Sequence, residues 1–267
     1  MSNLHRFAVV TGASSGIGDA YAERMAERGY DLILVARRRD RLEDVAKRIK
    51  IKTNRAVEIV TADLSDANDL LRIEALLTER EDIDVLINNA GLGALGPTSK
   101  VAADALENLI RINILALTRL TRAVLPGFLR RNTGTIINIA SMIAVMPTPS
   151  GAGYSGSKAY VLNFTRSLQM ELAKTNIVVQ AVLPGPVRTE FFEASGLTAA
   201  PFPNELFMSA EQLVDTALQA LAQGELVCFP SLENASLWTD LENARIALSR
   251  ALMQSGSPAT RYSEKAL

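Results

Sequence analysis

The chain has very little histidine and cysteine. Its 267 residues include one histidine, His5, and one cysteine, Cys228. A single cysteine cannot form an internal disulfide, and its apolar neighbours in the stretch LVCF indicate a small core residue. These two residues leave few ligands for a transition-metal site, so we expect no metal. The lack of a disulfide framework favours a reducing compartment, and we expect a cytoplasmic protein.

The sequence also lacks an excess of one charge and lacks long apolar runs. Lysine and arginine number 28 and aspartate and glutamate number 29, which gives a net charge of −1. No basic excess therefore points to a nucleic acid or an anionic membrane as partner. The apolar runs are short and broken by charges, so we expect no segment that spans a bilayer. Residues 1–10 also lack the layout of a signal peptide.

A glycine-rich turn, TGASSGIG at residues 11–18, allows two interpretations. Its central part fits the G-x-S-x-G elbow of serine hydrolases, with Ser14 as the nucleophile. Such a serine needs an adjacent base, usually histidine, and His5 precedes it in a segment that we expect to be frayed. The hydrolase is therefore a distant alternative, and a phosphate cradle explains the turn better.

Apolar runs typical of buried strands alternate with helical patterns along the chain. The expected strands cover residues 7–11, 31–36, 57–62, 83–88, 135–140, 177–183 and 226–229. The expected helices cover residues 16–28, 40–50, 66–79, 101–131, 154–174 and 210–222. Strands rich in Val, Ile and Leu that are separated by helices predict a parallel sheet covered on both faces. We expect an α/β fold with a doubly wound (Rossmann) parallel sheet of about seven strands.

The turn after the first expected strand indicates a dinucleotide. Gly12, Gly16 and Gly18 would let the backbone approach a pyrophosphate at a helix N-terminus. The spacing is G-x-x-x-G-x-G, which differs from the standard G-x-G-x-x-G, so a tight turn without a ligand is the alternative. In the dinucleotide interpretation Ser14 and Ser15 are hydroxyl donors to phosphate.

The end of the second expected strand indicates which dinucleotide. An acidic residue here would bind the ribose of NAD, but Ala36 stands at this place and arginines follow it. Arginine pairs with phosphate, which favours the 2′-phosphate of NADP(H). We expect Arg37 to bind this phosphate with help from Arg38, although a solvated helix start explains some of Arg38, Arg39 and Arg41.

Several short motifs in this order resemble the short-chain dehydrogenase/reductase family over residues 6 to about 230. The motifs are Thr11 to Gly18, Asp63-Leu64, Asn88-Asn89-Ala90-Gly91, Asn113, Ser141, Tyr154-x-x-x-Lys158 and Pro184-Gly185-Pro186-Val187-Arg188-Thr189. The resemblance implies an NADP(H)-dependent enzyme acting on a small carbonyl or alcohol substrate. It also implies a homodimer or homotetramer.

The resemblance also implies a role for each matched position. Asn113, Ser141, Tyr154 and Lys158 match the catalytic tetrad, in which the asparagine would hold a water that relays protons to the lysine. The residues implied or expected to contact the cofactor are Gly12, Ser14, Ser15, Gly16, Ile17, Gly18, Arg37, Arg38, Asp63, Leu64, Asn89, Ala90, Gly91, Tyr154, Lys158, Pro184, Gly185, Val187 and Thr189. Within this set, Asp63 and Leu64 would meet the adenine, and Val187 and Thr189 the nicotinamide carboxamide. Asn88 would help to hold the end of its strand against the cofactor.

Elementary chemistry supports the tyrosine and the lysine. Tyr154 and Lys158 are four residues apart at an expected helix start, so they share one helix face. An ammonium group favours phenolate, so we expect Lys158 to lower the pKa of Tyr154 from the ordinary value of about 10. Such a phenol can exchange a proton with a substrate oxygen while Ser141 hydrogen-bonds the same oxygen.

Apolar side chains dominate the segments expected to line the substrate site. Residues 186–209 are long for a strand-to-helix connection and correspond to the substrate lid of the family. The apolar residues of this lid and of the segment after Ser141 are Phe191, Phe192, Leu197, Phe202, Phe207, Met142, Ile143, Val145 and Met146. They favour a largely apolar substrate, although packing of the lid onto the body explains them equally well. Arg188 could meet a substrate anion, but we expect it to face solvent.

The expected organisation is one dinucleotide-binding catalytic domain, residues 1–253, with a mobile polar tail at residues 254–267. A helical stripe, formed by Leu237, Leu241, Leu248 and Leu252, packs on the body, covers the site or meets a partner subunit. The complete tetrad favours an NADP(H)-dependent oxidoreductase. A non-catalytic NADP(H)-binding sensor or scaffold is the alternative.

Overall fold

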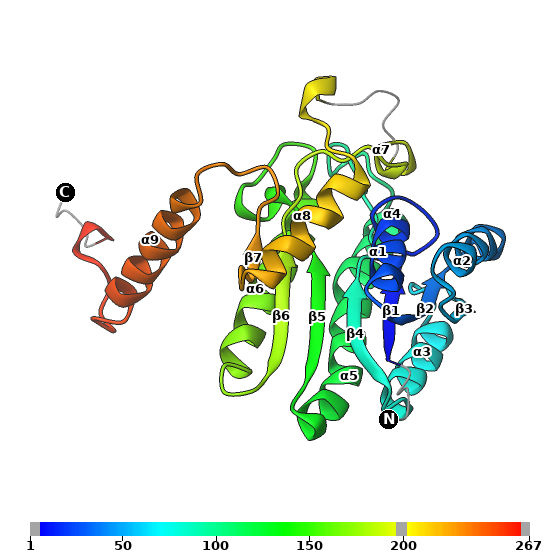
Figure 1. Ribbon diagram of the computed structural model, residues 1–267. Coiled ribbons are helices and arrows are strands. Elements are labelled where there is room, and N and C mark those ends of the chain that lie inside the picture. The colour runs from blue at the N-terminus through cyan, green and yellow to red at the C-terminus, as the bar shows by residue number, and fades with distance from the viewer. Residues whose placement is uncertain (1–5, 196–201, 263–267) are drawn as a thin grey trace. The chain divides into compact units, whose positions relative to one another are not determined.

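The computed structural model describes residues 6–195 and 202–262, and a parallel sheet forms its centre (Figure 1). The strands found in these residues are β1 (Phe7–Thr11), β2 (Asp31–Ala36), β3 (Val57–Thr61), β4 (Ile83–Asn88), β5 (Gly134–Ile139), β6 (Ile177–Val182) and β7 (Val227–Cys228). Their order in the sheet is β3-β2-β1-β4-β5-β6-β7, and every neighbouring pair is parallel. The predicted doubly wound α/β fold is confirmed.

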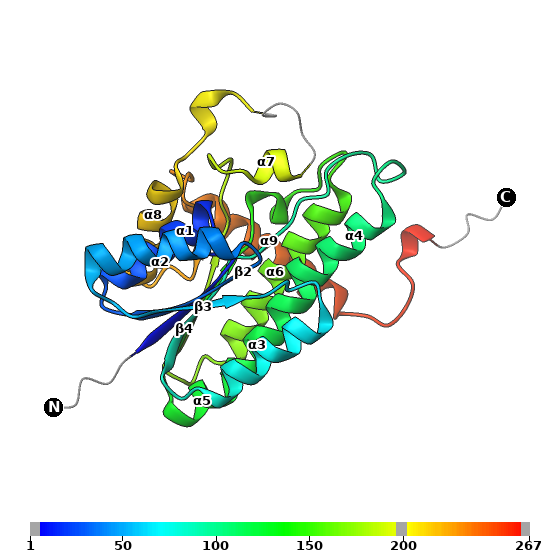
Figure 2. The ribbon, with the colours of Figure 1, turned by 90° about the vertical axis from the view of Figure 1, so that its right-hand side faces the viewer.

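Helices cover both faces of this sheet (Figure 2). One face carries α1 (Gly16–Glu27), α2 (Arg39–Thr53) and α8 (Ala210–Ala222), and the other carries α3 (Ala67–Glu79), α5 (Leu117–Arg131) and α6 (Ala152–Glu171). Alternate residues of β1 supply the two cores, because Ala8 and Val10 join one cluster while Phe7 and Val9 join the other. Burial on both faces explains why these strands read as continuous apolar runs.

The helix expected over residues 101–131 has three parts. It consists of α4 (Ala103–Ile110), a π-helical segment η1 (Arg111–Ala116) and α5. Such π-helical insertions occur often at functional sites, and this one contains Asn113. By length and composition Ala103–Arg131 could cross a membrane, and half of its most apolar window is buried inside the structure.

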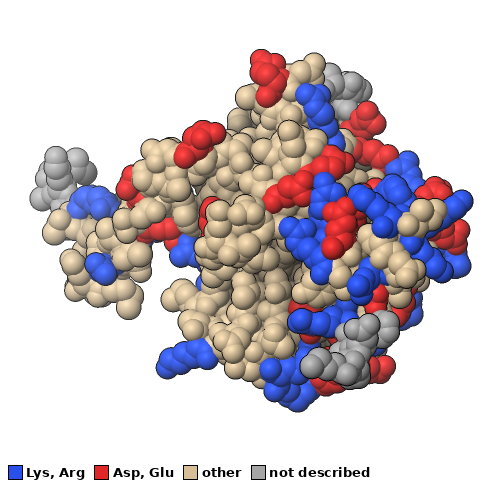
Figure 3. Space-filling view, viewed as in Figure 1, with Lys and Arg blue, Asp and Glu red and all other residues tan. Residues whose placement is uncertain are grey.

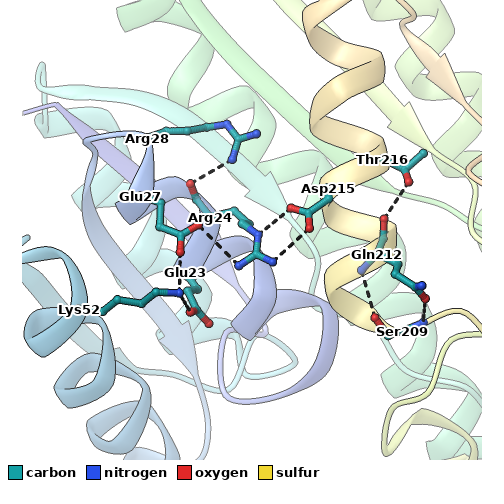
Figure 4. Close-up of polar contacts among 9 residues, drawn as sticks. All are labelled: Glu23, Arg24, Glu27, Arg28, Lys52, Ser209, Gln212, Asp215 and Thr216. Carbon is teal, nitrogen blue, oxygen red and sulfur yellow. Dashed lines mark hydrogen bonds and ion pairs between the residues drawn. The ribbon is translucent and has the colours of Figure 1, made fainter.

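Ion pairs join α1 to the neighbouring helices α8 and α2 (Figure 4). Arg24 donates to Asp215 on α8 at 2.6 Å, and Lys52 on α2 pairs with Glu23 and Glu27 on α1. A capping box between Ser209 and Gln212, drawn in the same figure, starts α8. Basic and acidic side chains lie side by side over the region of α1 and α2 (Figure 3).

The chain divides into two compact units, residues 1–230 and 231–267. The second unit contains α9 (Ser236–Leu252), which confirms the expected helical stripe of leucines. The sequence had suggested one domain up to residue 253, whereas the division falls after Pro230. The assignment of α9 to the catalytic domain stays a prediction. So does the mobile tail, of which residues 263–267 lie outside the described residues.

Candidate active site

The glycine turn brings three distant segments together. Gly12 and Gly16 adopt left-handed backbone conformations, with φ of 66° and 57°. A Cβ on Gly12 would lie 2.8 Å from Nδ2 of Asn89, and one on Gly16 would lie 2.8 Å from a methyl carbon of Thr189. A Cβ on Gly18 would lie 2.2 Å from the carbonyl oxygen of Gly12. Only glycine therefore fits at these positions, where β1, the end of β4 and the segment after β6 meet.

The shape of this turn fits the pyrophosphate of a dinucleotide. Helix α1 begins at Gly16, and its N-cap residue Ser15 makes no side-chain cap hydrogen bond, so the first amides of the helix are not satisfied by a cap. Arg38 donates to the hydroxyl oxygens of Ser14 at 3.1 Å and of Ser15 at 2.8 Å. Both serine hydroxyl protons therefore remain available for hydrogen bonds to a phosphate. The environment of Ser14 suits a hydrogen-bond donor to phosphate better than a nucleophile. His5, the base that a hydrolase would need, lies outside the described residues.

Thr11 joins β1 to β4 beside the turn. Its hydroxyl donates to the carbonyl of Ile87 at 3.2 Å and accepts from the backbone N–H groups of Asn89 and Ala90, both at 3.0 Å. The side-chain amide of Asn89 in turn donates to the backbone carbonyls of Thr11 at 2.9 Å and Gly12 at 3.2 Å. Thr11 was expected only as the first residue of the glycine-rich motif, with no role of its own. The available signal was a hydroxyl residue at the end of a buried strand, directly before the turn.

The side chain of Asn88 points into the core at the end of β4. Its side chain is 3% exposed and donates to Thr121 and to Asn138, both at 2.9 Å. The side-chain amide of Asn138 in turn donates a hydrogen bond to the hydroxyl of Thr165 on α6 at 2.9 Å. Asn88 therefore ties β4 to β5 and α5 inside the core.

The two arginines after β2 differ in what their side chains contact. Arg37 is 61% exposed in its side chain, and its guanidinium lies 3.8 Å from the carboxylate of Asp63. Arg38 instead reaches the serines of the turn, as described above. Arg37 lies at a bend directly after β2, and the extended Arg38 is the one whose side chain contacts the turn. The expected contacts of both arginines with a cofactor phosphate stay predictions.

The other residues expected to contact the cofactor differ in how deeply they are buried. Asp63 is half-buried, and its carboxylate accepts from the N–H of Ser65 at 2.9 Å and from its hydroxyl at 2.7 Å. Leu64 is 6% exposed and belongs to a core cluster, so its side chain does not face an adenine site. Val187 is also buried and bridges to Met208. The half-buried or exposed positions are Ile17, Ala90, Gly91, Gly185 and Thr189, while Pro184 is buried and its carbonyl accepts from the N–H of Met142.

The four tetrad residues meet at the carboxyl ends of β4 and β5. Ser141 follows β5, and its side chain lies near enough to the hydroxyl of Tyr154 on α6 to influence its pKa. Lys158 lies one turn further on α6, with Nζ 5.7 Å from the centroid of the Tyr154 ring, and donates to the carbonyl of Ile139 at 2.8 Å. A Cβ on Gly91 would lie 3.4 Å from Oδ1 of Asn113 and 3.5 Å from Nζ of Lys158. Both side chains therefore lie next to the loop that follows β4.

The side chain of Asn113 is engaged with protein groups. Its amide donates to the carbonyl of Leu92 at 2.9 Å and to the hydroxyl of Ser157 at 3.0 Å. Its oxygen accepts from the N–H of Leu92 at 2.8 Å. Asn113 therefore fixes the loop after β4, and its expected part in a proton relay stays a prediction.

Burial shifts the pKa values of the tyrosine and the lysine in opposite directions. Desolvation raises the pKa of Tyr154 to about 12, against the smaller lowering effect of the nearby Ser141 side chain. Desolvation also lowers the pKa of Lys158 to about 8. The expected lowering of the Tyr154 pKa by Lys158 is not found, and the loss of water around the phenol is the largest effect on this pKa. At neutral pH the phenol is protonated.

Aromatic rings of the lid cover the tyrosine. Phe191, in the short helix α7 (Phe191–Ala194), lies 5.3 Å from the Tyr154 ring between centroids. Phe192 packs against Phe202 at 6.2 Å and Phe207 at 5.7 Å. Leu197, the other apolar lid residue, lies outside the described residues. The lid therefore presents an apolar surface to the tetrad.

The rest of the expected substrate wall has exposed apolar groups. Val145 is 39% and Met146 46% exposed after Ser141. A cavity of about 340 Å³ lies beside the loop after β4, with Gly93 and Ser195 among its lining. The exposed Arg188 donates to the carbonyl of Asn204 at 2.8 Å, so the lid itself takes up this charge.

The single cysteine lies away from this chemistry. Cys228 on β7 is 2% exposed, and burial raises the pKa of its thiol to about 12. The expectation of a small core residue is confirmed, since a buried neutral thiol is unreactive.

The short chain dehydrogenase model matches residues 6–199. The chain is 35% identical over 229 residues to very-long-chain 3-oxoacyl-CoA reductase-B of Danio rerio, which covers 84% of this chain and 73% of that protein. It is 38% identical over 197 residues to the human protein named inactive hydroxysteroid dehydrogenase-like protein 1. That match covers 73% of this chain but 58% of the human protein, less than two thirds of its length.

Two solved structures resemble the chain over almost its full length. One is a short-chain dehydrogenase from Sphingobium yanoikuyae in complex with NADPH, with 41% identity and a TM-score of 0.92 over 96% of this chain and 100% of that one. The other is the bulky-bulky ketone specific alcohol dehydrogenase from Comamonas testosteroni, with 36% identity and a TM-score of 0.88 over 97% of this chain and 99% of that one.

Proposed function

The chain belongs to the short-chain dehydrogenase/reductase family, and from this we propose that it is an NADP(H)-dependent oxidoreductase. Its reaction transfers hydride between nicotinamide and the carbonyl or secondary alcohol of a largely apolar small molecule. The observation that carries this proposal is the placement of Tyr154 beside Ser141 and one helical turn from the buried Lys158.

The cofactor proposal rests on the turn and on Arg38. The left-handed glycines and the uncapped start of α1 suit a pyrophosphate, and Arg38 at the end of β2 suits a 2′-phosphate. The Sphingobium yanoikuyae relative is in complex with NADPH. When bound, the nicotinamide supplies or accepts the hydride.

The protein side of the reaction is proton transfer at one oxygen. A pKa of about 12 keeps Tyr154 protonated at neutral pH, the form that can donate to a carbonyl oxygen during reduction. Ser141 would hydrogen-bond the same oxygen. In the opposite direction Tyr154 must first lose its proton, and the ammonium form of Lys158 favours that loss.

An apolar substrate is supported by the surfaces on both sides of the tetrad. Phe191 covers the Tyr154 ring, and the half-exposed Met146 follows Ser141. The Comamonas testosteroni relative is named for specificity toward ketones with two bulky groups. We therefore propose bulky, uncharged ketones as the first substrates to test.

The test is NADPH oxidation with a panel of ketones, using Tyr154→Phe and the control Tyr160→Phe. Tyr160 lies on the same helix, and its hydroxyl meets Thr118 at 2.9 Å, away from Ser141. We expect Tyr154→Phe to lower kcat by about 10²- to 10⁴-fold while NADPH still binds, because only the proton donor is lost. Tyr160→Phe should retain the rate. Near-normal turnover by Tyr154→Phe would move the catalytic assignment elsewhere.

A non-catalytic sensor or scaffold is the second candidate, since a human relative is named inactive. It would bind NADPH yet show no turnover with any ketone of the panel. The homodimer or homotetramer stays a proposal, which light scattering at micromolar concentration tests. The cytoplasmic location is likewise a proposal, motivated by the single cysteine.

A further inference from the structure

A carboxylate from the lid lies on the arginines beside the glycine turn. Arg38 donates to one oxygen of Glu190 at 2.9 Å, and Arg41 pairs with the other oxygen. Glu190 directly follows Thr189, which contacts Gly16 of the turn. A residue about 150 positions away along the chain therefore reaches the site placed for a cofactor phosphate.

Arg38 binds this carboxylate and the turn at the same time. Its guanidinium donates to Ser14, Ser15 and Glu190. Arg41 and Arg38 lower the pKa of Glu190, so the carboxylate is charged at neutral pH. The site thus already holds an anion.

These ion pairs are exposed enough to exchange with another anion. The side chains of Arg38 and Arg41 are each 41% exposed, and that of Glu190 is 47% exposed. Solvent screens pairs of this kind, and each contributes little to stability. A ligand with more charge and more acceptor oxygens can therefore replace the carboxylate at small cost.

We propose that Glu190 is an internal competitor that occupies the 2′-phosphate site and that the 2′-phosphate of NADP(H) displaces. This inference rests on the proposed binding of NADP(H). A phosphate monoester carries more negative charge than a carboxylate and has three acceptor oxygens. The N-terminus of α2, which begins at Arg39, also favours the larger negative charge. NADH lacks the 2′-phosphate and leaves Glu190 in place.

Glu190 then sets how strongly the protein prefers NADP(H). Each NADP(H) molecule must break the pairs that Arg38 and Arg41 make with Glu190, whereas NADH need not. The lid carboxylate therefore reduces the affinity for NADP(H) and narrows the discrimination between the two cofactors.

The experiment measures dissociation constants for NADPH and NADH by isothermal titration calorimetry, with the full chain. The variants are Glu190→Gln and, as a control, Glu193→Gln. Glu193 is an exposed acid of α7 outside the Arg38–Arg41 cluster, so its change alters the net charge equally. We expect Glu190→Gln to tighten NADPH by about 3- to 10-fold, the value of one or two exposed ion pairs, and to leave NADH within about twofold. Glu193→Gln should leave both constants within about twofold of wild type, as solvent screening predicts.

A second experiment tests whether Glu190 affects NADPH binding through Arg38 and Arg41. In an Arg38→Gln/Arg41→Gln background, Glu190→Gln should have no further effect on the NADPH constant. A weaker or unchanged NADPH constant in the single Glu190→Gln variant overturns the inference, and so does equal tightening of NADPH and NADH. Failure of the wild-type protein to bind NADPH would instead overturn the proposed function.

Discussion

Replacement of Lys158 by methionine should stabilise the protein at neutral pH. Lys158 is 5% exposed, and burial lowers its pKa to about 8 from an ordinary 10.5. Keeping this lysine charged in the folded protein at pH 7 therefore costs about 3 kcal/mol. Methionine removes that cost at a similar length and loses the hydrogen bond to Ile139, which is worth about 1 kcal/mol. We expect a net gain of about 1–3 kcal/mol in the free energy of unfolding.

The gain should depend on pH in a defined direction. Because the folded pKa of Lys158 lies below its unfolded value, the unfolded chain binds more protons between about pH 8 and pH 10.5. The stability of the wild type then rises with pH across this window, and the advantage of Lys158→Met shrinks. At pH 9.5 about half of the cost remains. Tyr154, with a pKa of about 12, contributes stability that is lost only above pH 10, outside this comparison.

Thermal unfolding of wild type, Lys158→Met and Lys174→Met at pH 7 and pH 9.5 tests this without cofactor. Lys174 is an exposed lysine just after α6 and serves as the control. For a chain of this size, 1 kcal/mol corresponds to about 2–4 °C in Tm. A lower Tm of Lys158→Met at pH 7 would refute the reasoning, and so would a gain that does not shrink at pH 9.5. Either result would mean that the folded protein does not disfavour the charged lysine.

The remaining predictions concern cofactor binding, measured by titration of NADPH. Arg38→Gln should weaken NADPH by about 10-fold or more, as expected for the loss of a charge-assisted hydrogen bond, while Arg37→Gln should change it by less than about threefold. An equal or larger effect of Arg37→Gln would restore the order expected from the sequence. Gly18→Ala should weaken NADPH by more than about 10-fold, because the new Cβ would lie 2.2 Å from the Gly12 carbonyl and force the turn apart. Gly156→Ala, with no heavy atom within 4 Å of the new Cβ, is its control and should bind normally.

The sequence predicts the sheet well because burial on both faces leaves a strong pattern. Strands such as β2, with the run DLILVA, have every residue buried, and the expected and observed bounds agree. The helix over residues 101–131 was also expected, but its π-helical segment was not. Apolar periodicity in a window of that length does not resolve one extra residue per turn. The position of Asn113 within that segment therefore needed the structure.

The expected tetrad could be located because its spacing is local and its residue types are specific. Tyr154 and Lys158 occupy one face near the start of α6 as predicted. The sign of the Tyr154 pKa shift could not be predicted, since desolvation depends on what packs over the phenol. Phe191 of the lid and the loop after β5 supply part of that packing from distant parts of the chain.

The cofactor arginines show where local reasoning fails. Arg37 and Arg38 are adjacent and chemically identical, so the sequence VARRR cannot say which one faces the turn. In the structure it is Arg38 that donates to Ser14 and Ser15. Glu190 then adds a negative charge from a segment that only the fold brings close. Under this inference, the preference for NADP(H) depends on the attraction of Arg38 and Arg41 for the 2′-phosphate and on the competition from the Glu190 carboxylate. A count of the arginines after β2 leaves out this competition.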